Sequence, residues 1–171
     1  ARGTVQAAIK IVRDKADNDL MVREQNVLAL VDYKHLPVIL DTFQSTDGQR
    51  ATITEYIDGF DLTTIRQRYP TGVPQAHASW ILQRLLSGLS HLHEHGIFHG
   101  NLTPDNILVR PRDHNAFLID FVYSIINPDE TDKFVAATEN YTAPEAYSGK
   151  PPIEVSDLYS LGKCVIYLLG G

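Results

Sequence analysis

The sequence predicts an α+β fold, with β-rich segments early in the chain and helical segments dominating the remainder. Two β-rich runs, 38–43 and 51–57, flank an Asp47-Gly48 pair, which is typical of a hairpin turn. Residues 75–95 carry an amphipathic helical pattern, and residues 156–169 are rich in apolar side chains. A chain of 171 residues is long enough to bury a substantial core.

The composition is that of an ordinary globular protein, with 43% apolar and 21% charged residues. A net charge of −6 argues against nucleic acid or an anionic membrane as the main partner. The single Cys164 excludes an intrachain disulfide and suits a reducing compartment. No apolar run approaches the roughly 20 residues that span a bilayer, and Ala1-Arg2-Gly3-Thr4 has no apolar signal-peptide core. We therefore expect a cytoplasmic protein.

The early part of the chain begins with a predicted strand over Val5–Val12, which carries Lys10. A helix is expected over Leu20–Val31, because Leu20, Met21, Val27, Leu28 and Val31 form an apolar stripe. Cap-type residues at 17–19 precede that helix.

The later part begins with the helix over 75–95, which should end at Gly96. His91, His93 and His95 alternate near its end, but no carboxylate or cysteine arrangement nearby completes a zinc site. A short strand is expected to begin over 106–109, and residues 113–115 are expected to form a turn. The last helix is apolar nearly all round, which is typical of a buried helix and makes Cys164 an inert packing residue.

Several short motifs occur in a fixed order. His99-Gly100-Asn101-Leu102, followed by Asn106, resembles the catalytic loop H-R-D-L-x-x-x-N of the protein kinase family. Ala8-Ile9-Lys10 matches the end of the family's V-A-I-K strand, and Ala143-Pro144-Glu145 is its A-P-E motif. Asp120-Phe121-Val122 occupies the D-F-G position. Ser156–Gly162 resembles the start of the family's central helix, whose Asp157 would accept hydrogen bonds from the catalytic-loop backbone.

This resemblance covers essentially the whole chain and is closest to bacterial Ser/Thr kinases. It implies a bilobal protein-kinase-like fold, with an incomplete N-lobe in residues 1–57 and a C-lobe in residues 58–171 that is truncated after the central helix. The glycine-rich loop of the family is absent from the sequence. We expect the chain to be a piece of a longer protein.

The resemblance also implies a nucleotide site. Lys10 would contact the α- and β-phosphates of ATP and pair with Glu24 of the first helix, while Asn106 and Asp120 would hold Mg²⁺. The sequence allows two roles for Asp61, binding the ribose or capping a helix. The remaining implied nucleotide-binding residues are Ala8, the gatekeeper Thr54, the hinge backbones of Glu55 and Ile57, and Leu108.

The centre of the catalytic loop departs from the family. Asn101 replaces the aspartate that accepts the proton from the substrate hydroxyl, and a carboxamide is no comparable base. Thr103 stands where most relatives carry a lysine, and Gly100 replaces an arginine. Val122 replaces the glycine of D-F-G, so we expect less flipping of that segment, because a β-branched residue resists positive φ.

These departures favour a pseudokinase, a kinase-like module that binds ATP–Mg and acts through regulatory or scaffolding protein interactions. One alternative is a weakly active Ser/Thr protein kinase, since phosphoryl transfer depends mainly on positioning and electrostatics. A second is a nucleotide-independent protein-interaction module. In each case a partner or further chain is expected to cover the last helix, where Val165, Ile166, Leu168 and Leu169 would otherwise lack apolar neighbours.

Overall fold

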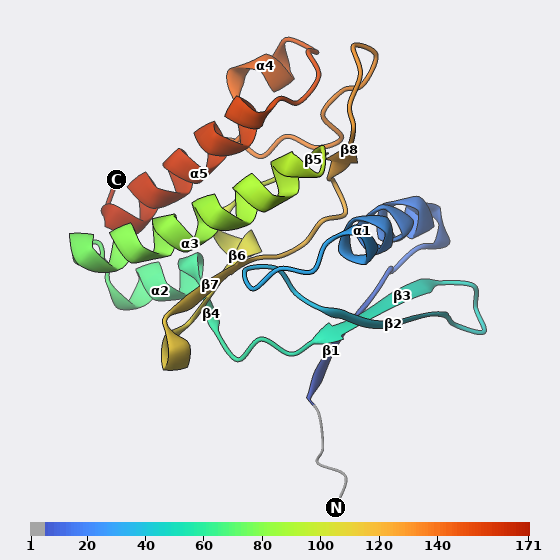
Figure 1. Ribbon diagram of the computed structural model, residues 1–171, viewed down its shortest axis with the longest axis horizontal. Coiled ribbons are helices and arrows are strands. Elements are labelled where there is room, and N and C mark those ends of the chain that lie inside the picture. The colour runs from blue at the N-terminus through green and yellow to red at the C-terminus, as the bar shows by residue number, and fades with distance from the viewer. Residues whose placement is uncertain (1–5) are drawn as a thin grey trace, which may run out of the picture.

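The computed structural model describes residues 6–171, so Ala1–Thr4 and the predicted strand start at Val5 lie outside the described residues. The fold is α+β and has the two parts that the sequence predicts (Figure 1). A small part holds a three-stranded sheet and helix α1. A larger part is built around helices α3 and α5, which run side by side.

The small part contains an antiparallel sheet with the strand order β1-β3-β2. Its strands are β1 (Ala7–Ile11), β2 (Ile39–Gln44) and β3 (Arg50–Glu55). The β2–β3 connection is the predicted hairpin, and Gly48 takes the positive φ of 83° that the turn requires. Strand β3 ends at Glu55 rather than at Ile57, because the antiparallel pairing with β1 stops at Ala7–Glu55.

Helix α1 (Asn18–Leu30) comes after a short 3-10 turn, η1 (Lys15–Asp17), and packs against the sheet. Its buried side includes Met21, whose sulfur accepts a 3.0 Å hydrogen bond from the Thr52 hydroxyl on β3. The Asn18 side chain accepts the Arg50 backbone N–H and donates to the Gly48 carbonyl. The helix is thereby fixed to both the sheet and its hairpin turn.

The larger part consists of helices, short strands and 3-10 turns. The helices are α2 (Leu62–Arg68), α3 (Gln75–Glu94), α4 (Pro144–Tyr147) and α5 (Glu154–Leu169). One small sheet has the order β4-β6-β7, and another pairs β5 with β8. These strands are β4 (Phe60–Asp61), β5 (Ile97–Phe98), β6 (Ile107–Arg110), β7 (Asn115–Leu118) and β8 (Ile125–Ile126). The 3-10 turns η2 (Pro104–Asn106) and η3 (Pro111–Asp113) flank β6.

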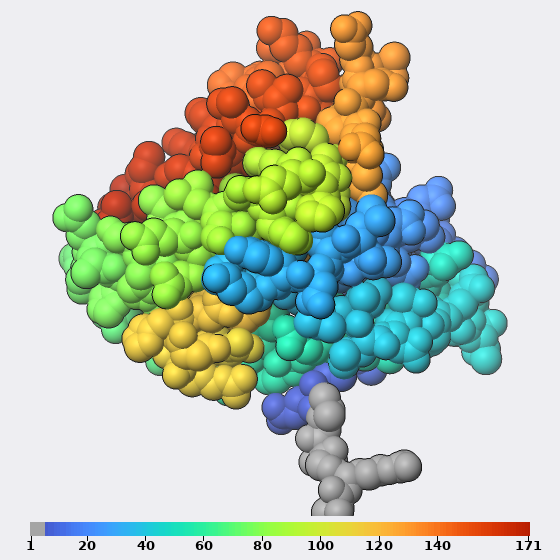
Figure 2. Space-filling view, viewed as in Figure 1, coloured from blue at the N-terminus to red at the C-terminus, as the bar shows by residue number. Residues whose placement is uncertain are grey.

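One apolar cluster joins the two parts. Helix α3 contributes Leu85, Leu89 and Leu92, each at most 1% exposed, and the segment after α1 adds Val31 and Leu36. Figure 2 shows this segment lying against α3 on the front of the molecule, where Tyr33 stacks on His91 with ring centroids 4.4 Å apart. Because each buried large apolar side chain contributes roughly 1.5–3 kcal/mol, this shared core holds the two parts together.

Helix α5 is buried on one side only, which corrects the prediction of a helix covered all round. Leu161, Cys164 and Leu168 face α3 and the core, and each is at most 1% exposed. The opposite side carries the exposed residues Val155, Leu158, Tyr159, Ile166 and Leu169. Leu168 was among the side chains expected to lack neighbours, but the core covers it completely. In the part of the chain that the structure describes, no helix is both long and apolar enough to cross a membrane.

Candidate active site

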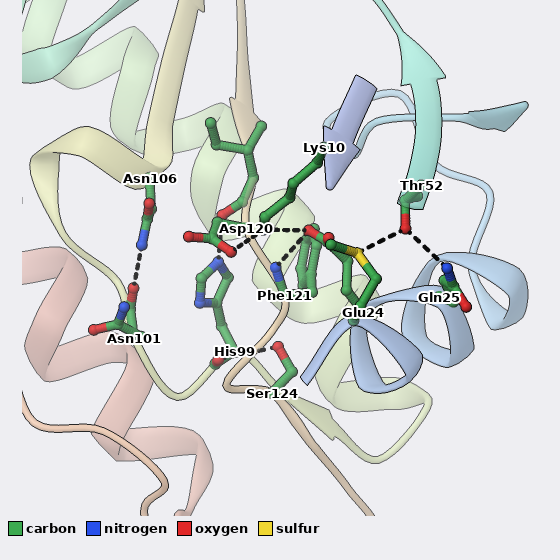
Figure 3. Close-up of polar contacts among 12 residues, drawn as sticks. Lys10, Glu24, Gln25, Thr52, His99, Asn101, Asn106, Asp120, Phe121 and Ser124 are labelled. Atoms are coloured by element: carbon green, nitrogen blue, oxygen red, sulfur yellow. Dashed lines mark hydrogen bonds and ion pairs between the residues drawn. The ribbon is translucent and has the colours of Figure 1, made fainter. Parts of the chain in front are cut away.

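Lys10 lies at the centre of a charged cluster assembled from three segments of the chain (Figure 3). Its Nζ atom is 3.1 Å from Oε1 of Glu24 on α1 and also donates to Oδ1 of Asp120, which comes after β7. The predicted Lys10–Glu24 pair is therefore present. A lysine held between two carboxylates cannot swing away freely, so its position in the cavity is fixed.

Glu24 is 5% exposed and binds two other segments through one oxygen. Besides Lys10, its Oε1 accepts a 3.2 Å hydrogen bond from the Phe121 backbone N–H, while Oε2 is buried with no partner among the described residues. Burial raises the pKa of Glu24, and the positive charge of Lys10 offsets part of that rise. Helix α1 is thus tied to both β1 and the start of the segment after Asp120.

A cavity of about 340 Å³ opens beside this cluster, between the small and large parts. We call it the inter-lobe cavity. It is lined by Ala8, Lys10, Glu24, Leu28, Pro37, Thr52, Thr54, Glu55, Tyr56, Ile57, Asn106, Leu108, Ile119 and Asp120. Its walls are mostly apolar. Lys10, Glu24 and Asp120 form one charged cluster in its lining, and Glu55 lies apart from them at the end of β3. The size and this separation of apolar walls from polar groups are typical of a small-molecule site.

Asn106 and Asp120 also line a second cavity of about 340 Å³ beside the catalytic loop, which we call the loop cavity. The Asn106 side chain donates from Nδ2 to the Asn101 carbonyl at 3.0 Å, and among the described residues its Oδ1 accepts no hydrogen bond. Asp120 has a positive φ of 67°, whereas Val122 keeps a negative φ. The unfavourable positive φ of this segment is therefore at Asp120 and not at Val122.

Asp157, from the start of α5, organises the backbone of the catalytic loop. It is 3% exposed and accepts hydrogen bonds from the backbone N–H groups of His99, at 2.9 Å, and Gly100, at 3.0 Å. This confirms the predicted contact with the loop backbone. The sequence did not indicate a third bond, 2.9 Å long, between Asp157 and Nε2 of His93.

His99 fixes the other side of the same loop. It is fully buried, and its Nε2 donates to the Ile119 carbonyl at 3.1 Å, while Nδ1 has no partner among the described residues. Burial lowers the pKa of His99, which favours the neutral ring. Its ring packs on Phe121 with centroids 4.9 Å apart, and its carbonyl accepts from the Ser124 hydroxyl. His99 thus connects the catalytic loop to the segment that comes after Asp120.

Asn101 points into the loop cavity, where its Oδ1 accepts a 2.9 Å hydrogen bond from the Thr138 hydroxyl. Thr103 lines the same cavity and is 8% exposed. The acidic groups of this cavity are Asp105 and Asp120, and among the described residues its lining contains no lysine or arginine. Thr103, and not a lysine, therefore stands beside Asn101 in the described lining of this cavity.

The sequence profile of the protein kinase domain matches residues 2–171, nearly the entire chain. The chain belongs to the protein kinase family. Bacterial Ser/Thr kinases are among its relatives, as the motifs of the sequence predict.

Serine/threonine-protein kinase D of Synechocystis is 32% identical over 138 residues, which is 76% of this chain and 26% of that kinase. Serine/threonine-protein kinase PknA of Nostoc is 34% identical over 144 residues, or 80% of this chain and 25% of that protein. PknH of Mycobacterium bovis is 31% identical over 159 residues, covering 91% and 26% of the two chains. The chain spans about a quarter of the length of these relatives.

In this kinase frame, most of the predicted nucleotide-site residues line the inter-lobe cavity, and Asn101 and Thr103 line the loop cavity. Asp61 lies outside both linings. Its Oδ1 accepts the Thr64 backbone N–H at 2.5 Å, so it acts as the N-cap of α2. The structure therefore shows the capping role of Asp61, one of the two roles that the sequence allows.

No sequence motif indicated Thr63 on α2, which lines the loop cavity and donates a 2.6 Å hydrogen bond to Asp105. Tyr141 and Tyr167 line the same cavity. These residues are distant in the chain and belong to no shared motif, so only the packing of α2 and α5 around the loop brings them together.

Proposed function

We propose that this chain is the core of a protein-kinase-like domain that binds ATP–Mg and transfers phosphate poorly or not at all. The observation that carries the proposal is a contrast within one site. The charged cluster of Lys10, Glu24 and Asp120 is complete, whereas the position of the catalytic base holds the carboxamide of Asn101.

The donor set of the inter-lobe cavity fits a magnesium nucleotide. Asp120 offers a carboxylate and Asn106 an amide oxygen, and oxygen atoms are the ligands that Mg²⁺ prefers. Lys10 supplies the cation for phosphate oxygens, and Thr54, Ile57 and the neighbouring apolar walls would surround the base. When bound, ATP would supply the phosphoryl group, with its charge partly neutralised by Mg²⁺.

The chain's own residues limit phosphoryl transfer from a bound nucleotide. The Asn101 amide oxygen is not a base near neutral pH, and the Thr138 hydroxyl already donates to it. With Thr103 in place of a lysine, no described residue that lines the loop cavity supplies a cation to stabilise charge on the transferring group. Loss of general-base assistance alone lowers a rate by about 10²–10⁴-fold.

Nucleotide binding is tested by thermal unfolding of the chain with and without millimolar ATP–Mg. At 100 times its dissociation constant, the ligand should stabilise the fold by about 2.7 kcal/mol. Lys10→Met should remove this effect, and Lys133→Met, which removes an exposed lysine outside the cavity, should preserve it. Unchanged melting of the unmodified chain would contradict nucleotide binding and favour the nucleotide-independent interaction module.

Phosphotransfer is tested with radiolabelled ATP and a generic Ser/Thr substrate. We expect little or no transfer by the chain itself and partial recovery in Asn101→Asp/Thr103→Lys, which restores a base and a cation. The retained Lys10, Asn106 and Asp120 favour a weakly active kinase as the second candidate. Turnover in the ordinary range of about 1–100 s⁻¹ would refute impaired catalysis.

We also propose that a protein partner or further chain covers the exposed side of α5. The support is its row of exposed apolar residues, with Val155 62% and Ile166 54% exposed. Residues 1–171 alone should therefore self-associate in sedimentation experiments, and Ile166→Glu should reduce this. A monomer with a sharp thermal transition would argue against the proposal.

The use of a single, buried cysteine, Cys164, supports a cytoplasmic setting.

A further inference from the structure

A third cavity, of about 390 Å³, lies between α2, the first turns of α3 and the end of β6. Helix α2 and the start of α3 are at one end of the molecule (Figure 1). We call it the α2–α3 cavity. Its lining is Phe60, Thr64, Ile65, Arg68, Tyr69, Val73, Pro74, His77, Trp80, Ile81, Val109, Pro111 and His114. None of these residues lines the inter-lobe cavity. Strand β6 separates the two, with Val109 lining one and Leu108 the other, because side chains alternate along a strand.

The walls of the α2–α3 cavity are apolar and aromatic. Val73, Ile81 and Val109 are buried and form its inner surface, while Phe60 and Trp80 present rings closer to the opening. Flat rings of this kind favour a flat apolar ligand, which they contact face-on or edge-on. The volume falls in the range of about 300–1,000 Å³ that is usual for small-molecule sites.

The polar groups of this cavity are all nitrogen-bearing or hydroxyl groups. Arg68 lies over the Phe60 ring, with its guanidinium carbon 5.2 Å from the centroid. The Trp80 indole N–H is 3.3 Å from Nδ1 of His77. Because an indole only donates, Nδ1 must accept and the proton of the His77 ring lies on Nε2, which is left as a donor.

The charge of the lining has one sign. Among the described residues that line the α2–α3 cavity there is no aspartate or glutamate, although the chain as a whole carries a net charge of −6. Two acidic residues adjoin lining residues in sequence, and both are engaged elsewhere. Asp113 is held by Arg110 at 2.8 Å, and Asp61 caps α2. Arg68 therefore provides a positive charge without a competing carboxylate in the lining, which favours an anionic group on the ligand.

We propose that the α2–α3 cavity binds a small aromatic molecule that bears one anionic group, such as an aryl carboxylate or aryl sulfonate. The ring system lies against Phe60 and Trp80, and the anion is bound by Arg68 with His77 as a second donor. This proposal does not depend on nucleotide binding, because the two cavities have separate linings.

The test uses two dyes of nearly the same shape with the full 171-residue chain. 1-Anilinonaphthalene-8-sulfonate carries the anion, and N-phenyl-1-naphthylamine lacks it. Trp80 is the only tryptophan in the sequence, so its fluorescence reports binding at this cavity. The anionic dye should quench Trp80 emission saturably and bind about tenfold tighter than the neutral dye, since a hydrogen bond to a charged group is worth roughly that factor.

Arg68→Glu should abolish the preference for the anionic dye, and Arg13→Glu is the matched control. Arg13 is exposed and lies in the small part, and its substitution makes the same change in net charge. Three results would overturn the proposal. These are equal affinity of the two dyes for the unmodified chain, an equal loss in both variants, or bright dye fluorescence without quenching of Trp80. The last result would place the dye elsewhere, for example on the exposed side of α5.

Discussion

Asp157→Asn is the substitution that most directly tests how the catalytic loop is held. The carboxylate receives the His99 N–H and the His93 ring on one oxygen and the Gly100 N–H on the other. All three donors approach a side chain that is 3% exposed, so water cannot easily replace it. Asparagine keeps the shape but offers a single acceptor oxygen.

The expected cost depends on these three bonds. If the amide oxygen of the introduced asparagine accepts from the His99 N–H and the His93 ring, the NH₂ group of the amide faces the Gly100 N–H, which then has no acceptor. In the reverse orientation the oxygen accepts from the Gly100 N–H, and the backbone N–H of His99 has no acceptor. A buried donor without a partner costs about 1–3 kcal/mol, and the remaining bonds lose the added strength of a charged acceptor. We therefore expect a loss of about 2–5 kcal/mol, a large share of a typical stability of about 5–15 kcal/mol.

The assay is urea unfolding followed by circular dichroism. At a denaturant slope of about 2 kcal/mol/M, the midpoint should fall by about 1–2.5 M. Asp58→Ala, which removes an exposed carboxylate between β3 and β4, is the control and should change stability by less than about 0.5 kcal/mol. If Asp157→Asn behaves like this control, the loop is held by something other than the carboxylate.

Three further predictions concern single residues. Burial raises the pKa of Glu24 above its ordinary value of 4.5. Above pH 4.5 the unfolded chain releases the Glu24 proton while the folded chain still holds it. The free energy of unfolding that Glu24 contributes therefore falls as pH rises above 4.5. Glu24→Gln should flatten that slope in urea unfolding measured across pH. Gly100→Ala should cost about 1–3 kcal/mol, since Gly100 has φ +74° and an added Cβ would lie 2.8 Å from the Tyr123 carbonyl oxygen. Gly149→Ala, at φ +67° with nothing within 4 Å, should melt closer to the unmodified chain. Burial raises the pKa of Cys164 to about 12, so iodoacetamide should alkylate it only on unfolding, as measured by mass spectrometry.

Each of these predictions has an opposing result. A pH slope that is unchanged in Glu24→Gln would mean that another group titrates in that range. Equal losses in Gly100→Ala and Gly149→Ala would mean that positive φ alone decides the cost and that the contact with Tyr123 is relieved. Rapid labelling of Cys164 in the native protein would show that α5 opens readily.

The sequence by itself determined most of the secondary structure. The hairpin formed where the Asp47-Gly48 pair predicts it, because that turn depends on a local backbone preference of glycine. Helix α3 spans Gln75–Glu94, close to the predicted 75–95, since its apolar period is a local property. The motif order also indicated the family and the Lys10–Glu24 pair. That pair came from resemblance, as no local rule links a strand lysine to a helix glutamate.

Tertiary structure decided what depends on groups distant in the chain. The apolar composition of α5 predicts burial on every side, yet only the side that faces α2, α3 and the core is covered. Asp61 caps α2, and the His93–Asp157 bond joins residues 64 positions apart. The α2–α3 cavity likewise combines side chains from Phe60 to His114. Sequence periodicity predicts which face of a helix or strand is apolar. The pairing of hydrogen-bond donors with acceptors depends on how the helices and strands pack, so it follows only from the tertiary structure.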